Sequence, residues 1–199
     1  MLSATNYLPI LFTHIEHYIP FQQDDKLLLS SLVKARRILK RQYLLQADTI
    51  CRHESFVVEG CLRMFYMDEK GDEYTLRFAI ENWWISDLES LLSGKPSGYH
   101  IEALENTIVL QLDVPSLEIL YNKIPLFDRY FRILHQHAFI AQSKRILQNI
   151  SLTGEERYKK FMETYPQWHA RIPQKYIASY LGITPEFLSQ IRKHRSVRK

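Results

Sequence analysis

The stretch IPQKYIASYLGITPEFLSQIRK, residues 172–193, has the residue pattern of two short helices joined by a tight turn. Ala178 is small enough for the point where two helices cross, and Gly182 can adopt the left-handed conformation that ends the first helix. Thr184 suits the N-cap of the second helix, and Pro185 suits its first position. The pattern predicts a helix-turn-helix, and a helical hairpin without a binding role is the plainer alternative. Its apolar positions are Ile177, Leu181, Ile183, Leu188 and Ile191.

Basic residues are concentrated at the same end of the chain. Residues 151–199 contain ten Lys or Arg and four Glu, a net charge of +6, whereas the whole chain carries +4. Residues 1–150 therefore carry a net charge of −2. A charge run by itself is more often a solvated surface. Beside a helix-turn-helix, however, it favours binding to the phosphate backbone of double-stranded DNA.

The composition is that of a folded protein without a membrane segment. The 199 residues are 46% hydrophobic and 13% aromatic, which is enough to build a core. No run of about 18 apolar residues occurs, and the first 20 residues lack the basic start of a signal peptide. Cys51 and Cys61 are too few for a closed zinc or iron–sulfur site, and a disulfide between them is the less favoured alternative. We therefore expect a cytoplasmic protein with two free thiols, no cofactor and no membrane partner.

The chain changes from a helical to a β pattern after about 35 residues. Apolar residues at helical spacing predict helices over 10–18 and 24–33. From Arg37 to Leu112, short runs rich in Val, Ile, Tyr and Phe alternate with turn residues about every ten positions, which indicates antiparallel strands. A jelly roll or barrel would limit their exposed edges. The clearest strands are 62–67 and 73–80, which flank a loop with Gly71, and 99–104 and 107–112.

A short helix over 115–122 and a much longer one over 125–150 follow the strands. In the long helix Leu126, Ile133, Ile140 and Leu147 recur every seven residues, and they form a continuous apolar stripe. Such a stripe can pack on its own domain, but its length favours pairing in a homodimer. Thr153 and Glu156 then form a capping box for a further helix that ends at Pro166. We expect dimer contacts from Phe127, Ile133, Leu134, Ile140, Ala141 and Leu147.

This order of elements resembles the Crp/Fnr family of bacterial transcription regulators. The resemblance is most specific at residues 176–193 and at WWISDLESLLSGKPSGYHIEALENT, residues 83–107, which looks like the phosphate-binding cassette of that family. It implies an α+β fold with N-terminal helices, a cyclic-nucleotide-binding-like β jelly roll, a long dimerisation helix and a C-terminal helix-turn-helix. The implied domains are a sensor over 1–124, a dimerisation helix over 125–150 and a DNA-binding domain over 151–199. The family also implies a homodimer on a palindromic site, a small-molecule effector and contact with RNA polymerase.

The cassette departs from the family's cyclic-nucleotide pattern, in which a Gly-Glu pair binds the ribose and an Arg-Ser pair neutralises the phosphate. Ser86-Asp87 and Tyr99-His100 stand at those places. Tyr99 carries no positive charge, and His100 carries one only when protonated, whereas a pocketed phosphate is held best by Arg. Lys95 in the same loop is a weak substitute. We therefore expect an effector pocket of Ser86, Asp87, Tyr99 and His100 that does not take cyclic AMP, or a roll that serves only as a scaffold.

The resemblance assigns base reading to the second helix of the helix-turn-helix, at Pro185, Glu186, Ser189 and Gln190. Well-known family members have an Arg-Glu pair and a later Arg there. Glu186 can accept from a cytosine amino group, and Gln190 suits adenine better than guanine. No wing hairpin follows this helix, so its C-terminal end should contact phosphates as a tail. The expected DNA-backbone residues are Lys175, Thr184, Arg192, Lys193, Arg195 and Arg198.

Other patterns in the sequence favour neither a metal site nor an enzyme. His14 and His17 share a helical face but lack a third ligand, and His135 and His137 fall on different faces of a helix. Neither a phosphate-binding P-loop nor a Gly-x-Ser-x-Gly motif occurs. The alternative to a DNA-binding regulator is a ligand-binding or protein-interaction module of the same fold that has lost DNA binding.

Overall fold

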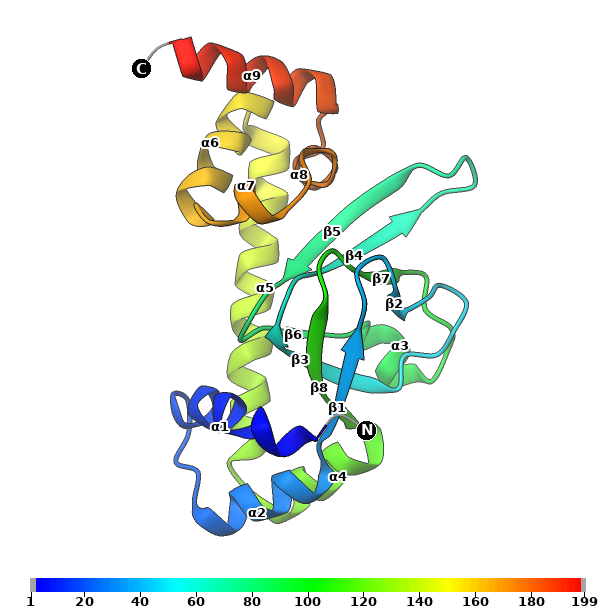
Figure 1. Cartoon of the computed structure of the whole chain (residues 1–199), viewed down its shortest axis with the longest axis vertical. Coiled ribbons are helices and arrows are strands. Elements are labelled where there is room, and N and C mark those ends of the chain that lie inside the picture. The colour runs from blue at the N-terminus through cyan, green and yellow to red at the C-terminus, as the bar shows by residue number, and fades with distance from the viewer. Residues whose placement is uncertain (1–2, 198–199) are drawn as a thin grey trace. The chain divides into compact units, whose positions relative to one another are not determined.

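The computed structural model describes residues 3–197, with side chains up to residue 194. The chain divides into two compact units (Figure 1). Unit 1 comprises the residues up to 64 together with 78–136, and unit 2 comprises 65–77 together with the residues from 137 onward. The tip of one β-hairpin therefore belongs to the same unit as the C-terminal helices. The sequence had suggested three domains cut at 124 and 150.

The helices of unit 1 share one apolar core with the outer face of a β-sheet. This core includes Leu11, Ile15, Leu29, Leu120 and Tyr130, which are all fully buried or nearly so. The helices predicted over 10–18, 24–33 and 115–122 are present. They form α1 (Leu8–Glu16), α2 (Gln23–Leu32) and α4 (Val114–Lys123), and a short 3-10 helix that was not predicted, η1 (Ala4–Asn6), precedes them.

Two four-stranded antiparallel sheets form the β-roll, and a second apolar core fills the space between them. The bend predicted at Gly60 needs glycine, because φ there is 101° and a Cβ would lie 2.4 Å from Thr107 Oγ1. The sequence patterns missed the short β2 (Tyr43–Leu45), β6 (Trp84–Ile85) and α3 (Leu88–Ser93). One sheet has the order β1 (Lys34–Ile38), β8 (Thr107–Asp113), β3 (His53–Glu59) and β6 (Trp84–Ile85), and the other has the order β2 (Tyr43–Leu45), β7 (His100–Ala103), β4 (Leu62–Met67) and β5 (Glu73–Ala79).

Helix α5 (Phe127–Ser151) is the predicted long helix, but its two halves differ in burial. Phe127 is 0% exposed inside the core of unit 1, and Leu134 packs against that core. The prediction that Phe127 contacts a dimer partner is therefore wrong, because the chain's own helices bury it. Ile133 is half-buried, whereas Ala141 is exposed and Ile140 and Leu147 are 49% and 64% exposed.

Unit 2 contains the remaining helices, which are α6 (Gly154–Thr164), α7 (Trp168–Arg171), α8 (Gln174–Leu181) and α9 (Pro185–Val197). The predicted capping box is present, since Thr153 Oγ1 accepts from Glu156 N and Glu156 Oε2 accepts from Thr153 N. Phe161 and Trp168 are buried among these helices. The Trp168 ring stacks on the Tyr165 ring, with the two ring centres 3.9 Å apart. The helix-turn-helix therefore rests on a core of its own.

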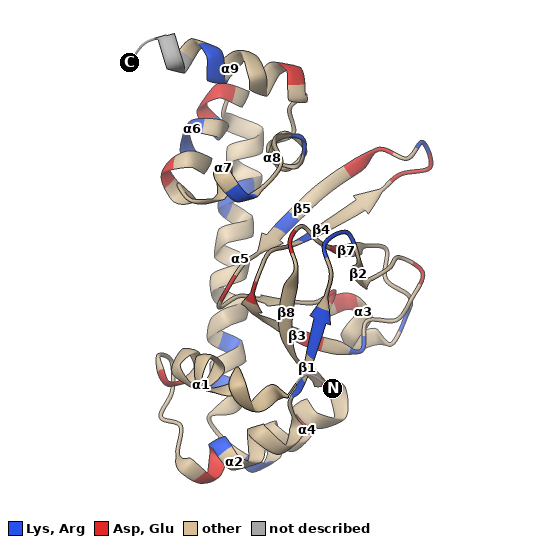
Figure 2. Cartoon of the chain, viewed as in Figure 1, with Lys and Arg blue, Asp and Glu red and all other residues tan. Residues whose placement is uncertain are grey.

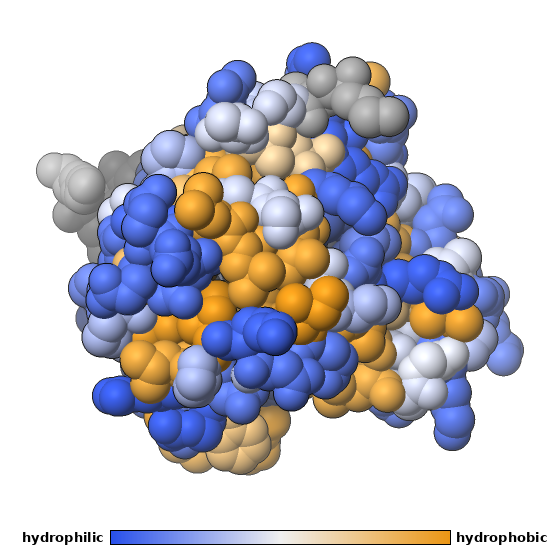
Figure 3. Space-filling view, turned by 90° about the horizontal axis from the view of Figure 1, so that it is seen from below, coloured by the Kyte–Doolittle hydropathy of each residue, from blue (hydrophilic) through white to orange (hydrophobic). Residues whose placement is uncertain are grey.

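Apolar side chains also gather on the surface that Figure 3 shows from below, over the helices of unit 1. Exposed large apolar side chains in these helices include Ile10 of α1, Leu27 of α2 and Ile119 of α4. Among residues 3–197, no helix combines the length and the apolar character that crossing a bilayer requires.

Candidate functional site

The turn between α8 and α9 has the geometry that its sequence predicts. Gly182 has φ 64° and ends α8 in the left-handed conformation. Its N–H donates to Ser179 O at 3.2 Å, and Ile183 N donates to Ala178 O at 3.1 Å. This pair of bonds is a Schellman motif, which satisfies carbonyl groups at the end of a helix. The turn therefore fixes the direction in which α9 leaves α8.

Thr184 is the N-cap of α9, as predicted. Its Oγ1 accepts from Phe187 N at 3.1 Å, and its carbonyl accepts from Leu188 N at 3.0 Å. Because the hydroxyl oxygen is the acceptor, its hydrogen stays available to donate to a phosphate. The cap thus holds the first turn of α9 in place while leaving a donor at its start.

The four predicted base-reading residues, Pro185, Glu186, Ser189 and Gln190, are all exposed on α9. Leu188 and Ile191 on the other face are buried, so α9 presents a polar face outward and an apolar face inward. Glu186 and Gln190 are four positions apart and therefore lie one above the other on the polar face. Such a face can be inserted into a major groove.

Phe187 lies with one side of its ring against the start of α6, although the side chain is 42% exposed. A Cβ placed on Gly154 would lie 2.7 Å from the Phe187 ring and 2.8 Å from Ile183, so glycine is needed where α6 begins beneath α9. The sequence left the direction of Phe187 open between the core and a thymine methyl group. Its contact with Gly154 places it against α6, although part of the ring is exposed.

The predicted DNA-backbone residues that the structure describes are exposed on unit 2 (Figure 2). Lys175 lies in the first turn of α8 with its ammonium group 4.6 Å from the Tyr176 ring centre. Arg192 and Lys193 are exposed near the end of α9. Arg195 is described only as part of the α9 backbone, and Arg198 lies outside the described residues. The exposed cations can therefore flank the base-reading residues on both helices.

Arg157 of α6 is a basic residue whose role the sequence did not reveal. Its Nε donates to Leu181 O at 2.9 Å, and its Nη1 donates to Leu152 O at 2.8 Å. Two longer bonds run to Asn149 O and Gly182 O. The guanidinium group therefore satisfies carbonyls at the end of α8 and after α5, rather than facing a phosphate.

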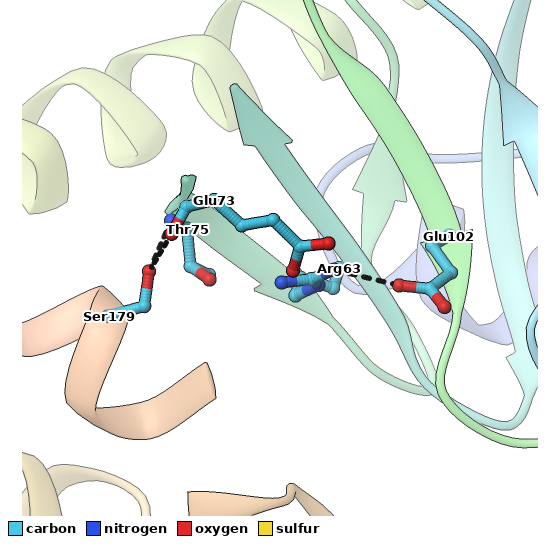
Figure 4. A network of polar contacts seen from close by, with 5 residues as sticks. All are labelled: Arg63, Glu73, Thr75, Glu102 and Ser179. Carbon is cyan, nitrogen blue, oxygen red and sulfur yellow. Dashed lines mark hydrogen bonds and ion pairs between the residues drawn. The ribbon is translucent and has the colours of Figure 1, made fainter. Parts of the chain in front are cut away.

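The hairpin of β4 and β5 is bonded to α8 through Ser179 (Figure 4). Ser179 Oγ donates to Glu73 O at 2.7 Å and accepts from Thr75 N at 2.9 Å. Arg145 of α5 adds bonds to the carbonyls of Leu76, Thr75 and Tyr180, and its guanidinium stacks 3.9 Å from the Tyr180 ring centre. No local sequence pattern predicts these contacts, because they join residues about 35 to 106 positions apart.

Arg63 is a fully buried cation in unit 1, and no local sequence pattern predicts its burial. Its Nη2 lies 2.8 Å from Glu102 Oε2, so the pair joins β4 to β7 (Figure 4). A buried guanidinium needs such a partner, since an unpaired charge in a core is costly. The pair stabilises the roll and has no direct place in the site.

The predicted effector residues do not line one cavity. Asp87 is buried as the N-cap of α3, where Oδ1 accepts from Glu89 N and Ser90 N, and Ser86 Oγ donates to buried Glu54. His100 Nδ1 accepts from Ala47 N at 3.2 Å, so this nitrogen is unprotonated, and Tyr99 packs against the core of the roll. Lys95, the only Lys or Arg in the cassette, is exposed.

The roll instead contains an open cavity of about 580 Å³ along β1, β2 and β3. Of the four predicted effector residues, only Ser86 lines it. The part of the interior next to the cassette is filled by apolar side chains, including Leu62, Met64 and Leu91. Among the described residues, no three His, Cys, Asp or Glu side chains come together in a way that could hold a metal ion.

Comparison with known proteins identifies the class of fold. Residues 35–123 match the cyclic nucleotide-binding domain. FixK2 from Bradyrhizobium japonicum is similar in structure, with 18% identity over 83% of this chain and 85% of that chain and a TM-score of 0.74. A candidate transcriptional regulator of the Crp/Fnr family from Eubacterium rectale has 17% identity over 92% and 88% of the two chains and a TM-score of 0.69.

The catabolite activator protein of Thermus thermophilus shares the fold as well, with 18% identity over 93% of this chain and 87% of that chain and a TM-score of 0.56. No curated protein matches the chain in sequence. Residues 35–123 thus have the fold of a cyclic nucleotide-binding domain, and the whole chain has the fold of the Crp/Fnr transcription regulators. The fold predicted from the sequence is confirmed.

Proposed function

We propose that the chain is a transcription regulator that binds double-stranded DNA through α9 as a homodimer. The observation that carries this proposal is the polar face of α9, on which Glu186, Ser189 and Gln190 are exposed above buried Leu188 and Ile191. The helix is held by the Gly182 turn and the Thr184 cap, which gives the preorganised geometry that base reading requires. This role is that of a regulator and not of an enzyme.

The dimer part of the proposal rests on the second half of α5. Large apolar side chains are exposed there over three turns, and a solvated helix normally does not retain such a surface. Pairing with the same helix of a second copy would bury them around a two-fold axis. This would present two copies of α9 to successive major grooves. The exposed apolar side chains are Phe139, Ile140, Ile146, Leu147 and Ile150.

The regulator should not respond to cyclic AMP. In the cassette, Asp87 is used as a helix cap and His100 Nδ1 accepts a backbone N–H. Lys95 is exposed and is the one Lys or Arg of this loop. None of these three side chains supplies the fixed cation that a phosphodiester bound in a pocket needs. Contact with RNA polymerase stays a prediction from the resemblance.

Binding to a mixed-sequence DNA duplex, followed by fluorescence anisotropy at several salt concentrations, tests DNA binding. We expect binding at low salt. The double variant Arg192→Gln/Lys193→Gln should weaken it for every sequence and lower the salt slope by about two per protomer, or about four per dimer. The control is Lys159→Gln, which removes one exposed lysine on α6. It should leave binding at low salt nearly unchanged and change the salt slope by no more than about one per protomer. Absence of binding at about 50 mM salt would favour the module that has lost DNA binding.

A further inference from the structure

The open cavity along β1, β2 and β3 has a lining of one charge sign. Among its 17 lining residues are three arginines and one histidine, and none is Asp or Glu. The arginines, Arg36, Arg41 and Arg52, are exposed at its rim, and β1 stands out as a basic strand in Figure 2. Burial lowers the pKa of His53, so this ring acts there as a neutral group. The positive charge of the cavity therefore comes from three guanidinium groups.

These guanidinium groups are available to a ligand. Within residues 3–197, the side chains of Arg41 and Arg52 make no hydrogen bond or ion pair. Arg36 reaches from β1 toward β2, where its two terminal nitrogens lie 3.4 and 3.3 Å from the carbonyls of Leu44 and Tyr43. These distances exceed those of a strong N–H···O bond, so an anion would be a better acceptor.

The loop that carries Arg41 is held in a fixed and strained conformation. Arg41 has φ 71°, an uncommon value for a residue with a side chain. Two backbone bonds hold it there, from Arg41 N to Ala103 O at 2.7 Å and from Ala103 N to Gln42 O at 2.9 Å. Strain of this kind persists where the surroundings enforce it, and it is concentrated at ligand sites.

The floor of the cavity is polar although it lies in an apolar roll. Ser55 and Gln111 face each other from β3 and β8, are 1% and 8% exposed, and are joined by a bond from Gln111 Nε2 to Ser55 Oγ at 3.0 Å. In the described part of the chain, Gln111 Oε1 and the Ser55 hydroxyl hydrogen have no further partner. Both residues line the open cavity, so these polar atoms can form hydrogen bonds with an occupant.

We propose that this cavity binds a hydroxylated organic anion, with a phosphate or carboxylate at Arg36, Arg41 and Arg52 and hydroxyl groups at Ser55 and Gln111. The volume of about 580 Å³ suits such a molecule and is far larger than a single inorganic ion needs. Sugar phosphates and hydroxy-polycarboxylates share this chemistry. Ile85, Ser86 and Ile101 of the cassette stretch line the site, whereas its arginines and its floor lie outside that stretch, and ligand binding there does not depend on DNA binding.

Calorimetry on the full chain at low salt, with four probes, tests this proposal. We expect glucose 6-phosphate or citrate to bind with a Kd of about 1 mM or tighter, and glucose not to bind. Whichever of the two anions binds more tightly identifies phosphate or carboxylate as the preferred group. Inorganic phosphate should bind at least about tenfold more weakly, because it cannot reach the floor. Equal affinity for inorganic phosphate would overturn the assignment of the floor.

Two charge-matched triple variants separate the site from general attraction. Arg36→Gln/Arg41→Gln/Arg52→Gln should weaken binding at least about tenfold. The control variant Arg37→Gln/Arg129→Gln/Arg132→Gln removes three exposed arginines of unit 1 that do not line the cavity, and it should keep affinity within about twofold. The proposal is overturned if neither anion binds below about 10 mM, or if both triple variants weaken binding equally.

The floor residues provide a second test that does not change the charge. Ser55→Ala should weaken the binding of the hydroxylated anion about three- to tenfold and leave the weak binding of inorganic phosphate unchanged. Gln111→Leu should do the same, and circular dichroism shows whether each variant is folded. If both folded variants bind the hydroxylated anion as well as the unchanged chain does, the floor does not contact the ligand.

Discussion

Arg157 of α6 donates from Nε to the carbonyl oxygen of Leu181 at 2.9 Å, and so closes the C-terminal end of α8. The same side chain bonds to Leu152 O, just after α5. Arg157 therefore connects α8 of the helix-turn-helix to α6 and to the end of α5. Arg157, a basic residue of unit 2, thus acts on the conformation of the helix-turn-helix.

Arg157→Met should loosen the turn that orients α9. Its hydrogen bonds involve a charged donor, and their loss should cost about 1–3 kcal/mol locally. The amides of Gly182 and Ile183, which are bonded to Ser179 and Ala178, should then exchange hydrogen about ten- to hundredfold faster. Lys159→Met on the same helix is the control. Unchanged exchange in Arg157→Met would mean that the Schellman turn holds without this residue.

Ile140→Glu should abolish the dimer. Ile140 is 49% exposed in the chain and lies on the apolar stripe of α5, so two glutamates would meet in the interface without partners. Burying unpaired charges there should cost about 3–5 kcal/mol. Light scattering should report a dimer for the unchanged chain and for Gln142→Glu, and a monomer for Ile140→Glu. A monomer for the unchanged chain at micromolar concentration would contradict the pairing of α5.

Unit 1 should lose stability as the pH falls from about 6.5 toward 4, because burial, with His17 adding to it, lowers the pKa of His14 to about 4. Trp84 Nε1 donates to the Tyr130 hydroxyl at 2.7 Å, and this hydroxyl is hydrogen-bonded to Nδ1 of His14 at 2.8 Å. In this range the unfolded chain binds more protons than the folded chain, so the stabilisation is complete above about pH 6.5 and decreases below it.

The expected loss of unfolding free energy is about 1–2 kcal/mol, since the His14 ring is only partly buried. Urea unfolding at pH 7, 5.5 and 4.5, followed by the fluorescence of the buried aromatic residues, measures it. His14→Gln should flatten this dependence, whereas His17→Gln should leave most of it. Equal pH dependence in the unchanged chain and in His14→Gln would assign the effect to other groups.

Cyclic AMP at about 100 μM should give no heat of binding, because the cassette offers no fixed cation to its phosphate. Any weak binding should come from the rim of the open cavity, and it should disappear in Arg36→Gln/Arg41→Gln/Arg52→Gln. Binding with a low-micromolar Kd that survives the loss of these three arginines would show that backbone donors, Lys95 or His100 hold the phosphate after all.

Local patterns were sufficient to predict most of the fold. The Gly182 turn, the Thr184 cap and the capping box at Thr153 each depend on a few adjacent residues, and each is present. The strands around Gly71 also follow from local alternation and turn chemistry.

The features that the sequence did not reveal depend on contacts between distant segments. The heptad spacing includes Phe127, but only the packing of α1, α2 and α4 shows that this ring is buried. The bonds of Arg145 and Arg157 could not be predicted either. Their acceptors are main-chain carbonyl groups, which every residue has and which the sequence therefore does not distinguish. The cavity of the roll is lined by residues of six strands and could not be predicted from any one of them.

Selection of binding sites from random duplex DNA by the full chain tests the central claim most directly. A two-fold dimer with α9 in each major groove should return an inverted repeat whose half-sites lie about ten base pairs apart, centre to centre. Gln190→Ala should weaken the best site by roughly 1–3 kcal/mol and relax the preference at one base pair per half-site. Recovery of no repeat, or a selected sequence that Gln190→Ala leaves unchanged, would contradict base reading by α9.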